Sequence, residues 1–186
     1  MKVLVIGNGA REHVLCKSLN SSNKVSEVFV APGNGGTSEC AVNVSINSDD
    51  ISGLLSFVQS NDIDLTVVGP EIPLSLGIVD VFEENGLNIF GPTKFAAQIE
   101  SSKLFAKNLL VEIGVPTADF CVVDDYQQVG LDTFKFGPPY VIKADGLAAG
   151  KGVSIVDTFD EASLVLRSHL VDKTFGSASE KVIVEQ

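Results

Sequence analysis

Residues 140–152 (YVIKADGLAAGKG) combine lysines and glycines in a pattern that suits phosphate binding. The apolar start of this stretch is typical of a β-strand, and Lys143 lies at its end. The loop that follows is rich in glycine, which lacks a Cβ, so its backbone N–H groups can turn inward around an anion. Lys143 and Lys151 add positive charge from the strand and from the loop. The stretch therefore predicts a phosphate cradle.

Two other interpretations of this stretch can be compared with the phosphate cradle. A mobile Gly/Ala turn could join two strands, because the apolar residues 153–156 (VSIV) follow at once. A P-loop would need four residues between its glycines, a hydroxyl residue after the lysine and a helix after the loop. Here three residues separate Gly146 from Gly150, and Lys151 is followed by Gly152. The lysines favour a glycine-rich hairpin lid over phosphates rather than a plain turn or a P-loop.

Composition limits the class of protein and its partners. The chain has 186 residues, of which 45% are hydrophobic and 20% are charged, as is usual for a soluble globular protein of one or two domains. The formal net charge of −11 argues against a surface for nucleic acid or for anionic membranes. It does not exclude a small anionic ligand, because local lysines and backbone amides decide that binding. We therefore expect small-molecule partners.

The cysteines and the N-terminal segment indicate a cytoplasmic protein. Cys16, Cys40 and Cys121 are odd in number and have no metal-ligand or redox spacing, so we expect buried thiols in a reducing compartment. The apolar start (MKVLVIG) is too short for a signal peptide, and no apolar run approaches the length of a membrane span.

The first hundred residues alternate between strand and helix patterns, which predicts an open, mostly parallel α/β sheet of the Rossmann-like kind. In such sheets, ligands bind beyond the carboxyl ends of the strands. The expected strands are residues 2–6, 25–30, 42–46, 63–68 and 88–90, and the expected helices follow residue 10 and cover about 49–58 and 74–84.

The first of these strand ends does not carry a dinucleotide fingerprint. Gly7 and Gly9 match the start of G-x-G-x-x-G, but Glu12 occupies the place of the third glycine. The second strand ends in Val30, Ala31 and Pro32, so no acidic residue is available for a ribose. Both absences argue against NAD and hydride transfer.

The loop after the first strand could instead bind an anion, because a helix begins directly after it. The backbone amides of residues 8–10 at the helix N-terminus suit a phosphate. His13, in the first turn, fits better as a packing residue than as a ligand.

Glu71, which follows Gly69-Pro70 at another strand end, has two equally good interpretations. It could accept hydrogen bonds from sugar hydroxyls, or it could begin a helix where its charge suits the dipole.

The second half begins with a predicted helix from residues 101–102 to about 113, ended by Gly114 and Pro116. Lys103 in its first turn is unexpected, because cations are disfavoured at a helix N-terminus, so we expect an anionic group nearby. Further along we expect a strand at 117–123, a helical stretch after 124, a helix at 160–169 and a strand at 181–186.

Seven stretches of the chain can be compared with known families: VLVIGNGAREH, VFVAPGNGGT, DLTVVGPEIPLSLGIVD, IFGPTKFAAQIESSKLFAK, GVPTA, VIKADGLAAGKGV and VIVEQ. Together they resemble the phosphoribosylamine–glycine ligase family of the ATP-grasp superfamily. They span the chain in the order of the family, and as a set they are highly specific. Ala10 replaces a glycine that is usual in the family, and the chain is about half as long as the family or shorter.

The resemblance implies an ATP-dependent ligase that joins glycine to 5-phosphoribosylamine through a glycyl phosphate, in de novo purine biosynthesis. It implies that Lys143 and Lys151 take part in catalysis, and that magnesium or manganese ligands lie beyond residue 186. The implied ATP-binding residues are Lys103, Lys143, Asp145, Gly146, Ala149, Gly150, Lys151, Gly152, Glu185 and Gln186. The implied phosphoribosylamine-binding residues are Asn8, Gly9, Ala10, Arg11, Asn34, Gly69, Pro70 and Glu71.

The resemblance also predicts the domain organisation. Residues 1–101 would form a Rossmann-like substrate domain, and residues 102–186 the first part of an ATP-grasp domain with its hairpin lid. We expect these 186 residues to be inactive alone and the protein to be a monomer. Two alternatives stay open: another ATP-grasp carboxylate–amine ligase of the purine pathway, and a non-catalytic nucleotide-binding module that needs a partner chain.

Overall fold

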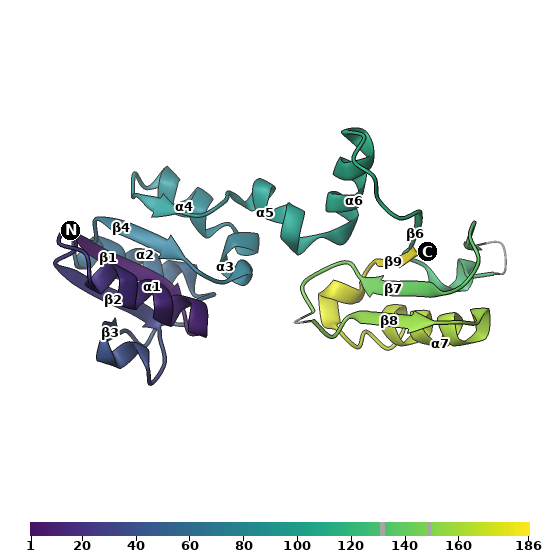
Figure 1. The fold of residues 1–186 in the computed structure, drawn as a ribbon, viewed down its shortest axis with the longest axis horizontal. Coiled ribbons are helices and arrows are strands. Elements are labelled where there is room, and N and C mark those ends of the chain that lie inside the picture. Colours follow the sequence, from purple (N-terminus) through teal and green to yellow (C-terminus); the bar gives the residue numbers. More distant parts are fainter. Residues whose placement is uncertain (131–132, 149) are drawn as a thin grey trace. The chain divides into compact units, whose positions relative to one another are not determined.

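The computed structural model describes residues 1–130, 133–148 and 150–186, which form two compact units, Met1–Ala97 and Gln98–Gln186 (Figure 1). The first contains a five-stranded parallel sheet in the order β3-β2-β1-β4-β5. Its strands are β1 (Lys2–Gly7), β2 (Glu27–Pro32), β3 (Val42–Asn43), β4 (Leu65–Val68) and β5 (Ile89–Phe90). The predicted parallel α/β sheet is therefore confirmed.

Strand β1 occupies the centre of this sheet because its side chains are apolar on both faces. It pairs in parallel with β2 on one side and with β4 on the other, so that Val5 lies between Val30 and Val67. Residues 3–6 are fully buried. A run without polar alternation suits a strand that is covered on both faces.

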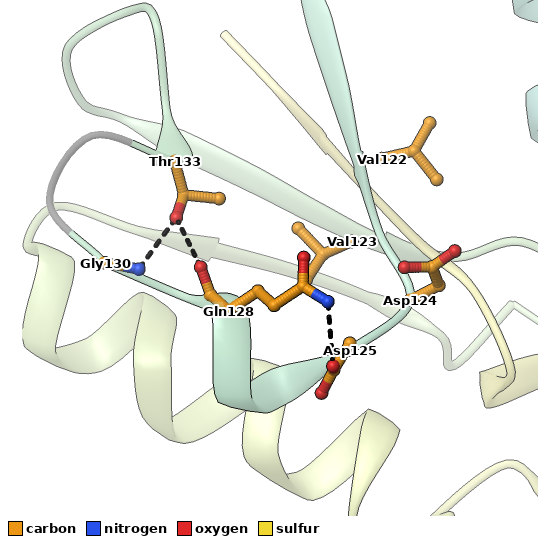
Figure 2. A pocket seen from close by; sticks show the side chains of 7 residues that line it. All are labelled: Val122, Val123, Asp124, Asp125, Gln128, Gly130 and Thr133. Carbon is orange, nitrogen blue, oxygen red and sulfur yellow. Dashed lines mark hydrogen bonds between the residues drawn. The ribbon is translucent and has the colours of Figure 1, made fainter.

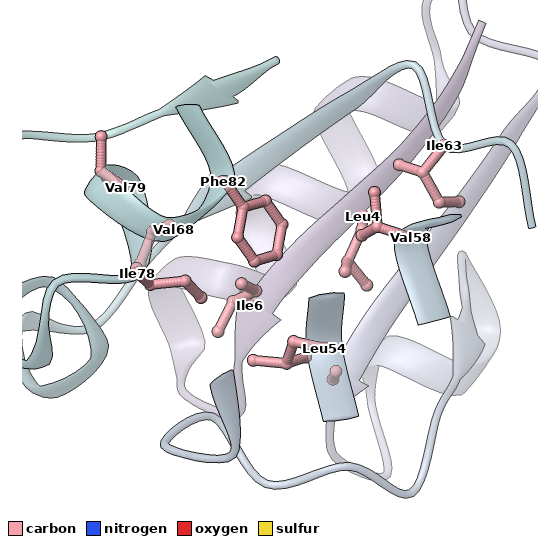
Figure 3. Close-up of a cluster of buried hydrophobic side chains, with 10 residues drawn as sticks. Leu4, Ile6, Leu54, Val58, Ile63, Val68, Ile78, Val79 and Phe82 are labelled. Atoms are coloured by element: carbon pink, nitrogen blue, oxygen red, sulfur yellow. The ribbon is translucent and has the colours of Figure 1, made fainter. Parts of the chain in front are cut away.

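Helices pack on the sheet and complete its core, which Figure 3 shows around Leu4, Ile6, Leu54 and Phe82. Helix α2 begins where expected, because the Asp50 carboxylate accepts the Gly53 N–H at 2.9 Å as an N-cap. The helices of this unit are α1 (Ala10–Asn20), α2 (Ile51–Ser60), α3 (Glu71–Leu76) and α4 (Ile78–Glu84), with a 3-10 turn, η1 (Thr37–Glu39). Helix α5 (Lys94–Ser101) crosses the unit boundary after Ala97.

The single helix predicted over residues 74–84 is wrong, because the structure has two helices there. Gly77 separates α3 from α4 with φ of +95°, a left-handed conformation that ends the first helix. The first helix also begins earlier than expected, directly at Glu71.

The second unit contains a four-stranded antiparallel sheet in the order β6-β9-β7-β8. Strands β7 and β8 form a hairpin that encloses the glycine-rich loop, so the predicted hairpin is confirmed. The strands are β6 (Phe120–Val123), β7 (Tyr140–Ala144), β8 (Val153–Val156) and β9 (Val182–Glu185), and the helical elements are α6 (Lys103–Glu112), α7 (Phe159–Leu170), η2 (Tyr126–Gln128) and η4 (Gly176–Ser179).

The two faces of this sheet differ in chemistry. One face is apolar and packs against α7, with Ile142 and Val184 of the sheet meeting Leu166 of the helix. Side chains alternate between faces along a strand, so Lys143 and Glu185 belong to the opposite face. Helix α6 reaches this face through Lys107, whose Nζ lies 3.5 Å from Glu185 Oε1.

Two other expectations for this unit need correction. After Asp124, the described residues form the short 3-10 turn η2 rather than a longer helical stretch, and the Asp125 carboxylate accepts the Gln127 N–H there. Strand β6 begins at Phe120 instead of 117, and Thr117 and Ala118 before it accept hydrogen bonds from the Lys107 side chain of α6. Among the described residues, no helix combines the length and the apolar character that crossing a membrane requires.

Candidate functional site

Lys143 and Glu185 form the centre of a charged site on the second unit. They lie on neighbouring strands, with Lys143 opposite Ile183 and Glu185 opposite Val141, so the two side chains are diagonal neighbours on one face. The Lys143 Nζ donates to Glu185 Oε2 at 2.7 Å. The Glu185 side chain is 10% exposed and the Lys143 side chain is 25% exposed. The sheet thus joins two residues that the sequence singled out separately.

Lys107 is a third charged member of this site, and the sequence reasoning missed it. It projects from α6, and its Nζ lies 3.5 Å from Glu185 Oε1. The same ammonium donates to Thr117 Oγ1 at 2.7 Å and to the Ala118 carbonyl at 3.0 Å. The signal was its spacing: Lys107 follows Lys103 by four residues, which places both on one side of a helix.

Lys103 lies at the base of the hairpin loop. Its Nζ donates to the carbonyls of Asp145 at 3.3 Å and Gly146 at 3.1 Å. Burial is the main cause that lowers the pKa of Lys103, and the positive charge of Lys143 acts in the same direction, while Asp145 opposes both. The site therefore contains a cation held close to a second cation, an arrangement that suits an anionic ligand.

Asp145 is the anionic group expected near the start of α6. Its carboxylate accepts the Leu104 N–H at 2.7 Å and the Ser102 hydroxyl at 3.1 Å. Ser102 also caps the helix by accepting the Phe105 N–H. The side chain predicted to bind ATP is thus used inside the chain, to hold the loop against the helix N-terminus.

The loop itself is anchored at both ends. Gly146 packs so closely on η4 that a Cβ there would lie 2.9 Å from the Ala178 backbone. Gly152 accepts the Ala144 N–H through its carbonyl at 2.9 Å, and a Cβ there would lie 2.7 Å from the Ala148 side chain. Gly150 has φ of +76°, which favours glycine, and Lys151 is exposed. Ala149, a predicted ATP-binding residue, lies outside the described residues.

An apolar surface adjoins the lysines. Val153 and Ile155 of β8 face the same side as Lys143, because Lys143 pairs with Val153 and Val141 with Ile155. They are 47% and 69% exposed. Exposed apolar side chains beside a lysine and a carboxylate suit a planar base with polar edges. The Gln186 N–H donates to the Asp119 carbonyl, so this donor is already used in the sheet.

The first unit has a second group of predicted site residues at the carboxyl edge of its sheet. The Asn34 amide donates to the Asn8 carbonyl at 2.8 Å, which joins the loops after β2 and β1. The Asn34 side-chain oxygen, Oδ1, accepts the N–H groups of Gly36 and Thr37. The Gly69 N–H donates to the Ile6 carbonyl and brings in the loop after β4. The loops that carry Asn8, Gly9, Ala10, Asn34, Gly69 and Pro70 therefore share one edge.

Glu12 is buried among these loops, and the sequence reasoning treated it only as a poor match to a glycine. Its side chain reaches back to accept the Gly9 N–H at 2.7 Å, so this amide is not available to a phosphate. A Cβ at Gly7 would lie 2.5 Å from Glu12 Cγ. The residue is 4% exposed, and its Oε1 has no hydrogen-bond partner in the described chain. The glycines leave room for this carboxylate.

Two other predicted residues of this edge, Arg11 and Glu71, lie in the first turns of helices α1 and α3. Arg11 and Glu71 form an ion pair at 3.9 Å with exposed side chains, which contributes little to stability. Glu71 is the first residue of α3, as one of its two interpretations required. His13 packs against a neighbour as expected, since a Cβ at Gly36 would lie 2.7 Å from its Cε1.

A separate pocket of about 480 Å³ follows strand β6 (Figure 2). Its rim is held by Gln128, which donates to Asp125 at 2.9 Å, and by Thr133, which accepts the Gly130 N–H at 2.7 Å. It contains none of the predicted site residues. Within the described ranges, no group of three or more His, Cys, Asp or Glu side chains could hold a metal ion.

A parallel α/β unit, followed by an antiparallel sheet whose lysines face a glycine-rich hairpin, defines the ATP-grasp class. Residues 1–100 match the "Phosphoribosylglycinamide synthetase, N domain" and residues 101–186 match the "Phosphoribosylglycinamide synthetase, ATP-grasp (A) domain". The chain therefore belongs to the phosphoribosylglycinamide synthetase family, as its sequence motifs predicted.

Individual relatives agree with this assignment. The phosphoribosylamine–glycine ligase of Xanthomonas campestris pv. campestris is 50% identical over the whole chain, which spans 44% of that protein. The crystal structure of phosphoribosylamine–glycine ligase from Thermotoga maritima superposes with a TM-score of 0.79 at 28% identity, over 100% of this chain and 44% of that one. The biotin carboxylase domain of Hydrogenobacter thermophilus 2-oxoglutarate carboxylase, a complex with MgADP, shares the fold at 15% identity and a TM-score of 0.79, over 99% of this chain and 43% of that one.

Proposed function

We propose that this chain supplies the substrate domain and the first part of the nucleotide site of an enzyme that joins glycine to 5-phosphoribosylamine. ATP would be consumed, and glycinamide ribonucleotide, ADP and phosphate would form. The observation that carries the proposal is the Lys143–Glu185 pair on the open face of the second sheet, in a chain that matches this family from end to end. We further expect a monomer in the cytoplasm, where the three free thiols would stay reduced.

The residues of the second unit fit a nucleoside triphosphate. The exposed Val153 and Ile155 would pack on the base, and the Glu185 end of β9 would meet its polar edge. Lys103 and Lys143 would hold the phosphates, and the exposed Lys151 would approach them from the hairpin loop. Phosphoryl transfer requires positioning and positive charge more than a protein nucleophile, which agrees with this donor set. Magnesium or manganese would accompany the triphosphate, and no ligand on this chain is assigned to it.

The proposed reaction has two steps. An oxygen of the glycine carboxylate attacks the γ-phosphorus of ATP, the bond to the β-phosphate oxygen breaks, and glycyl phosphate and ADP form. The amine of phosphoribosylamine then attacks the acyl carbon and expels phosphate, while the amine loses a proton. In the first unit, the loops that carry Asn8, Asn34 and Gly69 would hold the phosphoribosylamine. The N-terminus of helix α1, which follows Gly9, suits its phosphate.

The test is ATP-dependent phosphate release by the protein from the full reading frame, with glycine and phosphoribosylamine omitted in turn. We expect turnover only when both are present, and none from the 186-residue chain alone. Lys143→Met should abolish turnover, whereas Lys24→Met, at an exposed position of the first unit, should not change it. Turnover with a different carboxylate and amine would contradict the substrate assignment and keep the ATP-grasp fold. Binding of ATP without any turnover would instead favour a non-catalytic nucleotide-binding module.

A further inference from the structure

The Glu185 carboxylate is shared by two lysines, one on each oxygen. Lys143 reaches Oε2 from the neighbouring strand at 2.7 Å, and Lys107 reaches Oε1 from helix α6 at 3.5 Å. A single buried carboxylate therefore has two positive partners. One would be enough to compensate its charge, so the second partner calls for an explanation.

The two lysines differ in how firmly the chain holds them. An ammonium group has three N–H donors, and the Lys107 Nζ can direct them to Thr117 Oγ1, the Ala118 carbonyl and Glu185. It also lies over the Phe120 ring, 5.3 Å from the ring centroid. The Lys107 side chain is 10% exposed, against 25% for Lys143. Lys107 is thus fixed, while Lys143 borders the open face of the sheet.

This difference matters when an anion approaches. A phosphate on the open face would draw the Lys143 ammonium toward itself and at least partly away from Glu185. A buried carboxylate that loses its counter-ion is strongly destabilised. With Lys107 in place, Glu185 keeps one ion pair after Lys143 has turned, so the movement of Lys143 leaves no uncompensated buried charge.

We propose that Lys107 is a positioning residue: a fixed counter-ion that holds Glu185 in place and compensates its charge, so that Lys143 can transfer its ammonium to the phosphates of the nucleotide. The proposal rests on the proposed ATP site. It differs from a purely structural role, in which Lys107 only ties α6 to the residues before β6. A structural role would affect all ligands equally, whereas a counter-ion role affects ligands with phosphates.

The test compares ATP with adenosine, which lacks phosphates, by calorimetry on the protein from the full reading frame. Lys107→Met should weaken ATP binding about tenfold or more, roughly the effect of one lost charge interaction, and change adenosine binding by no more than about threefold. Lys107→Arg, which keeps the charge, should stay close to the wild type. Thr117→Val, which removes one anchor of Lys107 but no charge, serves as the matched control. Equal losses for both ligands would overturn the proposal.

A double variant and a measurement on the wild type guard against misfolding of Lys107→Met. Adding Glu185→Gln to Lys107→Met removes the carboxylate charge that needs compensation, so the selective loss of ATP affinity should disappear.

In the wild type, an amine-acylating reagent should modify Lys143 faster than Lys107, as measured by mass spectrometry. ATP, but not adenosine, should slow the reaction at Lys143. Equal labelling of the two lysines, or no effect of ATP on Lys143, would contradict the proposal. If the wild type binds neither ligand, the proposed function itself fails, and the inference fails with it.

Discussion

The carboxylate of Asp145, at the end of strand β7, accepts the backbone N–H of Leu104 at 2.7 Å in the first turn of helix α6. The two residues are 41 positions apart in the sequence. Their hydrogen bond fastens the start of the glycine-rich loop to the helix that carries Lys103 and Lys107. A side chain that the motif assigns to the nucleotide therefore works as a helix cap.

Replacement of Asp145 by alanine should destabilise the second unit by about 1–2 kcal/mol, the usual cost of a lost helix cap. The loss follows because the Leu104 N–H and the Ser102 hydroxyl lose their acceptor. Urea unfolding followed by circular dichroism would measure it. Asp124→Ala, at an exposed position after β6, is the matched control and should have little effect. Equal stability of the two variants would show that the cap is not formed.

Gly69→Ala should destabilise the first unit by about 1–3 kcal/mol, the usual cost of overpacking a filled site. A Cβ at this position would overlap Glu12 Oε1 and lie 2.6 Å from Glu12 Cδ. Gly35→Ala is the matched control, because a Cβ there meets nothing within 4 Å. Thermal unfolding of both variants gives the comparison. Adding Glu12→Ala to Gly69→Ala should recover part of the lost stability, because it removes the side chain that the new Cβ meets. If no stability is recovered, the contact with Glu12 is not the cause of the loss.

Acidification should weaken the fold through His169. Burial lowers the pKa of His169 below its usual 6.5, and its ring packs edge-on against Phe175. The unfolded chain therefore binds this proton at a higher pH than the folded chain, so the free energy of unfolding falls as pH drops through 6.5 toward the folded pKa. One proton contributes at most about 1.4 kcal/mol per pH unit.

The measurement is the free energy of unfolding between pH 8 and pH 5.5, roughly the range in which an ordinary histidine titrates. His169→Phe keeps an aromatic ring beside Phe175 but cannot take up a proton, so its pH dependence should be flatter than that of the wild type. The same slope in both proteins would mean that His169 is not the group responsible.

The three cysteines should differ in reactivity. Cys16 is fully buried, and burial, with smaller contributions from Cys40 and Glu12, raises its pKa to about 11. Burial also raises the pKa of Cys121, which is half-buried like Cys40. At pH 8 an aromatic disulfide reagent should modify Cys40 first in the folded protein and leave Cys16 unmodified until denaturant is added. Rapid reaction of all three thiols without denaturant would contradict this burial.

Local patterns were enough to predict most elements of both sheets. The apolar run of β1 predicted a strand of a parallel sheet, and the two apolar runs around the glycine-rich loop predicted the β7–β8 hairpin. The pattern failed where one residue outweighed the periodicity, as at Gly77, whose left-handed conformation divides one predicted helix into two. It also failed after Asp124, where an Asp side chain stabilises a short turn.

The sequence by itself determined the fold class and the family, and it singled out Lys103, Lys143 and the glycines of the candidate site, because these depend on neighbours along the chain. Only the tertiary structure decided how the charges are shared. Lys107 and Glu185 are far apart in sequence, as are Asp145 and Leu104, and each pair forms only when separate strands and helices pack together. Glu12 likewise became visible as a buried carboxylate only when the loops after β1 and β4 closed around it.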